Sequence, residues 1–568
     1  MTQVPRSLTR VAGNASLTQF DAIVIGSGAG GSVACWELSR RGASVLCLEA
    51  GPNYFIGLDD PSNQPVPLWS NDEIKLSVRN FIQQQGVAEP RTFRLRASQK
   101  ATVENDVNDL PKIVGGGMVH ADVKYVRFAP FDFQLGKLAS LYSGTAFVDW
   151  PLTYDELEPF YDEAETFIGV QGLRGSNPFE PPRSQDFPTP PGNPMYTHVV
   201  LAEGATKLGY HPFPYPTAVI SVPYRGRPAC NDCGFCSGYG CPINAKSSGA
   251  VTFLREALLT GKVQLRSECR VTKLVASGSS IKSVQYIDPD GAPQTASAPV
   301  YVLATSPIED ARLMLLSDPG GPGLGNSSGL VGHNLMFHWQ TISVGLYPQR
   351  IHGHRGRSVT GGLLDFRGNP DDLENHPLGG IIELSAAEPE LISEALEYAQ
   401  RVPSPARGAD LVRLMQFSPL RDHLAALLMQ AEDAPQDTNR VDLDPDIVDV
   451  FGLPVPRITS SPHAFELGAM KFYGPKMVDI HRAAGAQYGF WIPVVLGGPP
   501  DTRHIMGTLR MGTDPATSVT DPFGRFHDLG NLYCCDGAVF PTASGNNPLC
   551  TLQAMALRTA RNIGLDQP

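Results

Sequence analysis

A glycine-rich turn near the N-terminus constrains the fold of this chain more than any other feature. It lies in DAIVIGSGAGGSVACWELSRRGASVLCLEAG, the segment from Asp21 to Gly51. The apolar run Ala22–Ile25 predicts a short buried strand, Ser32–Arg40 has helical spacing, and Ser44–Leu48 predicts a second buried strand. A strand, turn, helix and strand in this order predict the first unit of a Rossmann-like α/β sheet.

The turn between the first strand and the helix has the spacing G-x-G-x-x-G. Gly26 permits the tight turn, Gly28 lets the backbone approach a pyrophosphate, and Gly31 lets the helix pack on the strand. The N–H groups at the helix N-terminus would face the phosphates. Glu49 ends the second strand, 23 residues after Gly26, where its carboxylate would accept hydrogen bonds from ribose hydroxyls. The pattern fits NAD or FAD, and its predicted cofactor contacts are Gly26, Gly28, Ala29, Gly30, Gly31 and Glu49.

Length and composition narrow the class of protein. The chain has 568 residues, more than one ordinary domain, and 42% of them are hydrophobic, enough for a large core. Its 57 glycines and 50 prolines indicate a loop-rich enzyme scaffold. A net charge of −12 without a basic cluster argues against a nucleic-acid partner. No apolar run approaches the roughly 18 residues of a membrane helix, so we expect no transmembrane segment.

The N-terminal residues bear on where the protein is located. Residues 1–20, MTQVPRSLTRVAGNASLTQF, have no twin arginine. They also lack the apolar stretch of roughly 7–15 residues that a secretory signal needs. We therefore expect a cytoplasmic protein, with export on a signal-bearing partner as the alternative.

The C-terminal part of the chain has the second strong pattern. It begins with HIMGTLRMG, from His504 to Gly512. A strand, a turn and an amphipathic helix are then predicted at Asn531–Cys535, at Asp536 and Gly537, and at Leu549–Ile563 with Pro548 in the first helical turn. This unit would return from the far end of the chain to complete the dinucleotide site.

Four stretches together resemble the glucose–methanol–choline (GMC) oxidoreductase family of FAD enzymes. They are GSGAGGSVACWELSRRGASVLCLEAG, LPKIVGGGMVHADVKYVRF, VLATSPIEDARLMLLS and the ending H-x-x-G-T-x-R-M-G…D-G-x-x-x-P-x-x-x-x-x-N-P. They span nearly the whole chain in the family's order. The resemblance implies FAD rather than NAD, and oxidation of an alcohol or sugar-like CH–OH group by hydride transfer to flavin N5. The sequence supports one dinucleotide site, because no second strand–G-x-G-x-x-G–helix is found in it.

The resemblance also implies the catalytic residues. His504 matches the family's catalytic histidine, and a neutral imidazole suits the removal of a hydroxyl proton near pH 7. Asn547 matches the second catalytic position, where an amide would bind the substrate hydroxyl or the developing alkoxide. Pro548 opens a helix whose positive end would stabilise the reduced flavin. The predicted cofactor contacts at this end are Asp536, Gly537, Asn547 and Pro548.

The middle stretch, LPKIVGGGMVHADVKYVRF, predicts a loop against the flavin. Gly116 and Gly117 follow an apolar strand in this prediction and permit close approach of the backbone. His120 is predicted to contact the flavin, since some sugar-oxidising relatives have a histidine here, in a few as the covalent link to the flavin. Val271 resembles the strand residue whose backbone meets the adenine.

Four cysteines within twelve positions, Cys230, Cys233, Cys236 and Cys241, have the spacing C-x2-C-x2-C-x4-C-P. Without an export signal, such a cluster indicates metal or redox chemistry before disulfides. The C-P ending is similar to ferredoxin-like loops, although the x4 gap departs from them. The position resembles the loop of bacterial sugar dehydrogenases that holds an iron–sulfur cluster. Structural zinc, and thiols or disulfides without a metal, are the alternatives.

We therefore predict an α/β protein with a discontinuous Rossmann-like FAD-binding domain and an α+β substrate-binding domain whose sheet covers the flavin. The predicted FAD-binding segments are 15–135, 215–335 and 500–568, and the predicted substrate-binding segments are 150–214 and 336–500. Residues 371–434 show no strand alternation, and Ala395–Leu427 has a helical pattern.

The predicted function is a dehydrogenase, in preference to an oxidase, acting on a small-molecule alcohol or sugar. One alternative is a lyase of the same fold with an inert flavin. Another is a catalytic subunit that passes electrons through the cysteine loop to a redox partner. The final acceptor, whether a quinone, a cytochrome or oxygen, is left open by the sequence.

Overall fold

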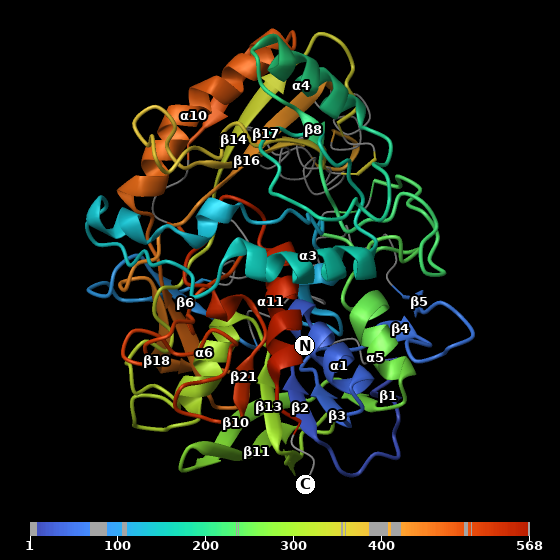
Figure 1. The fold of residues 1–568 in the computed structure, drawn as a ribbon, viewed down its shortest axis with the longest axis vertical. Coiled ribbons are helices and arrows are strands. Elements are labelled where there is room, and N and C mark those ends of the chain that lie inside the picture. The colour runs from blue at the N-terminus through green and yellow to red at the C-terminus, as the bar shows by residue number, and fades with distance from the viewer. Residues whose placement is uncertain are drawn as a thin grey trace.

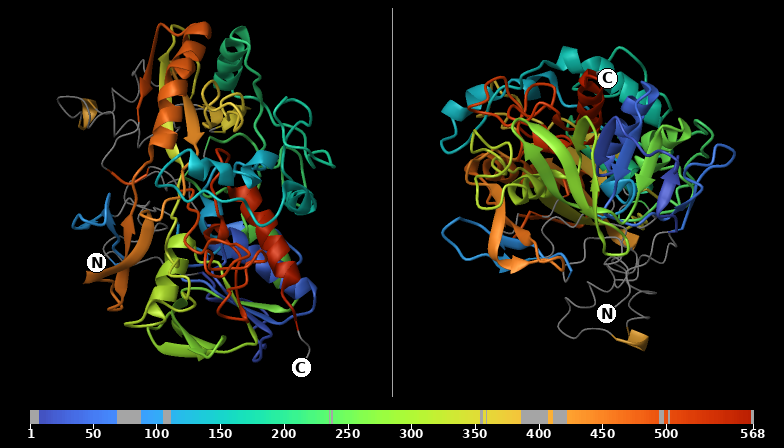
Figure 2. Two further views of the ribbon diagram at one scale, coloured as in Figure 1. Left: turned by 60° about the vertical axis from the view of Figure 1, so that its left-hand side comes forward. Right: turned by 90° about the horizontal axis from the view of Figure 1, so that it is seen from below.

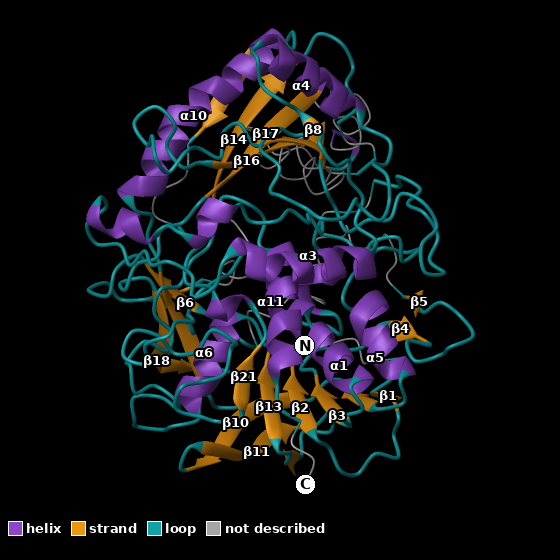
Figure 3. Ribbon diagram, in the orientation of Figure 1, coloured by secondary structure: helices purple, strands orange, loops and turns teal. Residues whose placement is uncertain are grey.

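Two large sheets lie at opposite ends of the long axis, and helix α3 (Tyr154–Ile168) lies across the region between them (Figures 1 and 3). The computed structural model describes residues 8–68, 88–104, 111–234, 236, 238–353, 356–357, 359–385, 407–410, 422–493, 498–500 and 503–565. The architecture is α/β with a Rossmann-like unit, which confirms the predicted fold class.

The first sheet is mostly parallel, with the strand order β1-β9-β3-β2-β13-β21. Its strands are β1 (Val11–Gly13), β9 (Val263–Arg266), β3 (Val45–Leu48), β2 (Ala22–Ile25), β13 (Val300–Leu303) and β21 (Leu532–Cys534). Only β1 pairs antiparallel with its neighbour. The central strands are buried along their whole length, because helices cover the sheet, and this explains why they read as continuous apolar runs.

Helices from both ends of the chain pack together on this sheet. Its helices are α1 (Ala29–Arg40), α5 (Arg255–Leu259), α6 (Pro307–Leu316) and α11 (Leu549–Asn562). In Figures 1 and 2, the C-terminal α11 lies beside the N-terminal α1. Gln553 in α11 donates a hydrogen bond to the carbonyl of Ala29 at 3.2 Å, and Arg561 pairs with Glu37 of α1 at 3.2 Å. The beginning and the end of the chain thus build one domain.

The second sheet is antiparallel, with the order β20-β14-β17-β16-β15-β8. Its strands are β20 (Tyr488–Ile492), β14 (Trp339–Leu346), β17 (Leu424–Ala431), β16 (Gly380–Ser385), β15 (Val359–Leu363) and β8 (Phe213–Pro214). Helices α4 (Tyr196–Lys207) and α10 (Ala464–Ala483) cover its outer face (Figure 3). Leu427, Met429 and Ile382 face these helices and form a core with Met470 and Met477.

Smaller elements complete the described part of the chain. The further strands are β10 (Arg270–Ser277), β11 (Ser280–Ile287), β12 (Pro293–Ala296), β18 (Arg440–Val448), β19 (Pro454–Thr459), β6 (Thr92–Arg94), β7 (Thr102–Val103), β4 (Phe55–Ile56) and β5 (Val66–Pro67). The short helical turns are η2 (Gly116–Val119), η3 (Pro130–Phe133), η4 (Gly136–Ser140), η5 (Ala250–Leu254) and η6 (Gly537–Val539).

Three local predictions were wrong. Residues 371–434 contain strands β16 and β17, and Leu424–Leu427 are extended instead of helical, while 386–406 and 411–421 lie outside the described residues. Central strands buried on both faces lose the alternation that a half-exposed strand has. Gly116 follows no strand: residues 113–114 are irregular and η2 begins at Gly116. The proposed division into two discontinuous domains stays a prediction.

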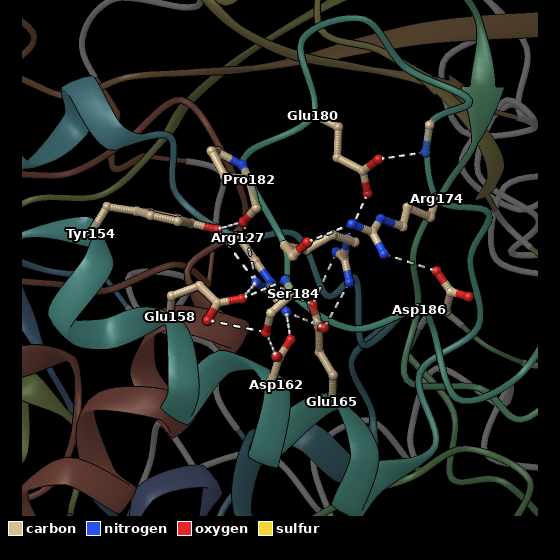
Figure 4. Close-up of polar contacts among 12 residues, drawn as sticks. Arg127, Tyr154, Glu158, Asp162, Glu165, Arg174, Glu180, Pro182, Ser184 and Asp186 are labelled. Carbon is tan, nitrogen blue, oxygen red and sulfur yellow. Dashed lines mark hydrogen bonds and ion pairs between the residues drawn. The ribbon is translucent and has the colours of Figure 1, made fainter.

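The buried Arg127 binds carboxylates of α3 (Figure 4), and its main chain joins this helix to the C-terminal part of the chain. The Arg127 guanidinium donates to Glu165 at 2.6 and 3.0 Å, to Asp162 at 2.5 Å and to Glu158 at 3.2 Å, all on α3. Burial acts to lower the pKa of Arg127, but Glu165 outweighs this effect and the pKa is raised. The main-chain carbonyl of Arg127 accepts a hydrogen bond from the Asn546 side chain at 3.0 Å. The ion pairs between Arg127 and α3 therefore fix the position of the segment that precedes α11.

Replacing Arg127 with methionine should lower the free energy of unfolding by about 3–5 kcal/mol, because the buried carboxylates of α3 lose their partner. Urea denaturation followed by tryptophan fluorescence measures the change. The control is Arg174→Met. Arg174 pairs with Asp186, their side chains are 49% and 82% exposed, and such a pair contributes about 1 kcal/mol or less. Equal losses in the two variants would contradict the structural role given to Arg127.

Candidate active site

The glycine turn lies between β2 and α1 and leaves no space for a side chain at Gly26, Gly30 or Gly31. Gly26 has a φ of +94°, and a Cβ added to it would lie 2.2 Å from the carbonyl oxygen of Ala304. A Cβ on Gly30 would lie 1.5 Å from the carbonyl oxygen of Cys535. No side chain caps the N-terminus of α1, so the N–H groups of its first turn are suited to an anionic ligand.

Glu49 directly follows β3 and is hydrogen-bonded to the glycine turn. One carboxylate oxygen accepts hydrogen bonds from the Ser27 main chain at 2.9 Å and the Ser27 hydroxyl at 2.6 Å, and the other accepts from the Gly51 N–H at 2.7 Å. Burial raises the pKa of Glu49, while these hydrogen bonds oppose the shift. Because each carboxylate oxygen has two lone pairs, Glu49 can also accept a hydrogen bond from a ribose hydroxyl.

The loop that contains Gly116 and Gly117 touches the glycine turn directly. Gly116 has a φ of +60°, and a Cβ on it would lie 2.6 Å from the Cα of Gly28. The Gly115 N–H donates to the Ser27 hydroxyl at 3.1 Å. Two backbone segments with no side chains between them form a cradle that fits the phosphates of a dinucleotide.

The C-terminal residues predicted to contact the cofactor follow β21, which, like β2, pairs in parallel with β13. Asp536 accepts hydrogen bonds from the main-chain N–H groups of Ser306 at 3.0 Å and Ala538 at 2.8 Å. The Gly537 carbonyl accepts from the Gly507 N–H at 3.0 Å, which connects this turn to the segment after His504. Pro548 precedes α11, whose N-terminus no side chain caps.

His504 and Asn547 lie side by side, and the structure adds a second histidine. His504 Nδ1 is 2.9 Å from His338 Nδ1, and His504 Nε2 is 3.5 Å from the Asn547 amide nitrogen. The Tyr215 hydroxyl donates to the Asn547 amide oxygen at 2.5 Å, which turns the amide N–H₂ toward His504. The lone pair of His504 Nε2 therefore faces Asn547, and its proton is at Nδ1, where it is donated to His338.

Burial keeps both histidines neutral. It lowers the pKa of His338 to about 3, against a small opposing effect of a hydrogen bond to the Ser544 main chain. Burial is also the largest cause that lowers the pKa of His504 well below 6.5, with further contributions from His338, Lys124 and Arg503. A neutral imidazole with a lone pair at Nε2 is the form that can accept a proton.

Sequence reasoning missed His338 and Tyr215. They lie 166 residues before His504 and 332 residues before Asn547, and no spacing connects such distant positions. Val271 lies in β10, opposite Tyr286 of β11. His120 is buried, and burial together with Lys246 lowers its pKa to about 3.

The cysteine loop contacts the segment that holds Gly116 and His120. The Gly238 N–H donates to the His120 carbonyl at 2.9 Å, and Lys246 Nζ donates to the carbonyls of Ala121, Cys236 and Tyr239 at 2.7–2.9 Å. All four thiols of the loop are free and half-buried. Over the described part of the loop, no three of them lie within 4.8 Å of one another, the spacing of a ready-made metal site. Main-chain N–H groups nevertheless donate to two of the sulfurs, those of Cys230 at 3.4 Å and Cys241 at 3.5 Å.

Comparisons with known proteins agree with this fold. Residues 24–82 match the NAD(P)-binding Rossmann-like domain, and residues 152–340 and 435–556 match the N- and C-terminal GMC oxidoreductase models. The chain belongs to the GMC oxidoreductase family and is an oxidoreductase.

Two curated relatives match nearly the whole chain. The 2-methyl-1,2-propanediol dehydrogenase of Mycolicibacterium austroafricanum is 30% identical over 96% of both chains. The gluconate 2-dehydrogenase flavoprotein of Pantoea cypripedii is 27% identical, over 96% of this chain and 94% of the relative. The crystal structure of pyridoxine 4-oxidase from Mesorbium loti shares the fold with a TM-score of 0.61 at 17% identity, over 95% of this chain and 98% of the other. Among the described residues, no helix has both the length and the apolar character to cross a membrane.

Proposed function

We propose that this oxidoreductase oxidises the CH–OH group of an alcohol or sugar-like substrate, with FAD as its cofactor and His504 as the base. The observation that carries the proposal is the buried neutral His504, whose Nε2 lone pair lies beside the Asn547 amide. The names of the two curated relatives, dehydrogenases of a diol and of gluconate, support a hydroxylated substrate.

The residues around the glycine turn fit FAD. The cradle between Gly28 and Gly116 has no room for a Cβ on Gly116, and the N-termini of α1 and α11 lack side-chain caps. The residues that would hold the cofactor are Gly26, Gly28, Ala29, Gly30, Gly31, Glu49, Gly116, Gly117, His120, Val271, Asp536, Gly537, Asn547 and Pro548. Bound FAD would supply an acceptor for the hydride that leaves the alcohol carbon.

The side chains around His504 would each have a separate role in the proton transfer. His504 Nε2 would accept the hydroxyl proton, while His338 holds the opposite ring nitrogen and so orients the imidazole. The Asn547 N–H₂ would donate to the oxygen on which negative charge develops, with the Tyr215 hydroxyl holding the amide in this orientation. The burial of Asn547 and His338 keeps water away from this proton transfer.

Replacing His504 with alanine should slow anaerobic flavin reduction by about 100- to 10,000-fold, because the base is lost. Asn547→Ala should slow it by about 10- to 1,000-fold, the effect of one lost donor to an oxyanion. Stopped-flow absorbance of the flavin measures both. The control is His527→Ala, since the His527 ring is hydrogen-bonded to Ser518 at 2.9 Å instead of to the catalytic pair. Near-normal reduction in His504→Ala would remove His504 from the mechanism, and product formation without flavin bleaching would indicate a lyase.

The lowered pKa of His504 predicts the pH dependence of the reaction. A histidine whose pKa lies well below 6.5 is already in its base form at pH 6, so raising the pH creates no more base. The rate constant of flavin reduction at saturating substrate should therefore change by less than about threefold between pH 6 and 8. A steep rise with an apparent pKa near 6.5 would show that His504 titrates as an ordinary exposed histidine.

We propose as an alternative that Cys230, Cys233, Cys236 and Cys241 would hold an iron–sulfur cluster. Such a cluster would supply a one-electron route to a quinone or cytochrome, and the protein would then be a dehydrogenase. The hydrogen bond between Gly238 and His120 supports this route, because it connects the loop to the proposed flavin-binding segment. The N–H groups that donate to Cys230 and Cys241 resemble those that stabilise thiolates around a cluster.

Anaerobically purified protein should contain iron and acid-labile sulfide in stoichiometric amounts. Both should disappear in Cys236→Ser and remain in Cys269→Ser, a buried cysteine outside the loop. Metal analysis with zinc measured alongside checks this. Protein without iron that forms peroxide rapidly from its substrate would end the relay proposal and favour an oxidase.

A further inference from the structure

The inner face of the second sheet presents a row of polar side chains next to the catalytic pair. Gln340 of β14 lies directly opposite Gln430 of β17, and Glu383 of β16 lies one diagonal step further. Their neighbours Met429 and Ile382 point to the other face, into the core under α10. A central sheet position normally holds an apolar side chain, so three buried or half-buried polar residues in a row need a reason.

These side chains form one hydrogen-bonded chain. Gln340 donates to Gln430 at 3.0 Å, Gln430 donates to Glu383 at 3.1 Å, and Lys124 pairs with Glu383 at 2.5 Å and with Asp122 at 3.1 Å. Glu383 is 1% exposed and Lys124 11%. The charges of Lys124, Glu383 and Asp122 are therefore paired within the array. The glutamine amides and the Lys124 ammonium can still form further hydrogen bonds to a ligand.

The array lies beside the reacting groups. The Ile381 N–H, two residues before Glu383, donates to the carbonyl of Gly545 at 2.7 Å, next to the turn that holds Asn547. Lys124 acts electrostatically on His504, while Glu383 and Asp122 act on Tyr215. A substrate whose hydroxyl reaches His504 Nε2 therefore has its remaining atoms near this face of the sheet.

We propose that this array is a substrate-binding subsite for a neutral polyhydroxylated molecule, a sugar or sugar alcohol. Each hydroxyl both donates and accepts, which matches an array that alternates amide, carboxylate and ammonium groups. An aliphatic alcohol would cover these groups without replacing their hydrogen bonds to water. A carboxylate or ammonium on the substrate would have to compete with the Lys124–Glu383 pair. The inference rests on the proposed function and deepens it by naming the substrate class.

The experiment uses the holoenzyme with D-sorbitol, D-glucose and D-fructose against D-gluconate, 1,2-propanediol and 1-hexanol. Anaerobic flavin reduction gives kcat and KM, and isothermal titration calorimetry gives Kd independently of turnover. At least one neutral polyol should have a kcat/KM about tenfold above that of the two simple alcohols. Gln340→Leu should raise the KM and Kd of that polyol about tenfold, and by more than it raises those of 1,2-propanediol. The matched control is Ile342→Val, on the same face of β14.

The outcomes separate the two proposals. Preference for a simple alcohol, tighter binding of gluconate than of every neutral polyol, or an unchanged polyol Kd in Gln340→Leu would each overturn the subsite. Binding of a neutral polyol that Gln340→Leu weakens, without flavin reduction by any compound, would support the subsite and refute the proposed oxidation. Should Gln340→Leu fail to fold, the Kd of the polyol in Gln340→Glu and the substrate comparison in the unaltered enzyme test the subsite instead.

Discussion

The contact between Gly30 and the Cys535 carbonyl is the constraint on which the rest of the structure depends. The two backbones approach so closely that no Cβ fits between them, and this places β21 beside β13 and α11 beside α1. The segment 505–511 then runs along the turn at Gly537 through main-chain hydrogen bonds. The turn proposed to bind the cofactor, from the start of the chain, and the proposed catalytic segment, from its end, thus share one frame.

Buried polar groups in this protein are held in hydrogen-bonded sets, because a single unpaired group in the interior is costly. Arg127 with the carboxylates of α3 is one set, and it bears on the turn at Asn546 through the Arg127 carbonyl. His504 and His338 form another, in which both rings stay neutral. The orientation of the proposed base is therefore decided by groups that need not touch the substrate.

Relatives with this fold act on different molecules, as the names of the diol dehydrogenase, the gluconate dehydrogenase and the pyridoxine oxidase show. A shared fold can account for a shared mode of cofactor binding, but it does not account for which substrate each relative accepts. In this chain, one face of the second sheet has polar side chains, among them Gln340 and Glu383, where a sheet core is usually apolar. The other face, with Met429, is apolar. Under the proposed subsite, specificity is a property of that face, while the first sheet positions the proposed chemistry.

The sequence by itself determined the features that depend on neighbouring residues. The turn from Gly26 to Gly31, the strand Ala22–Ile25 and the helix that starts near Pro548 were predictable, because a tight turn, a buried strand and a helix start each need particular residues within a few positions. The strand β17 was not, since burial on both faces erases alternation. Only the tertiary structure brought His338 to His504, Tyr215 to Asn547 and Gln340 to Gln430. These contacts join segments far apart in the chain, and the energy that selects them is released only when the two sheets and their helices pack together.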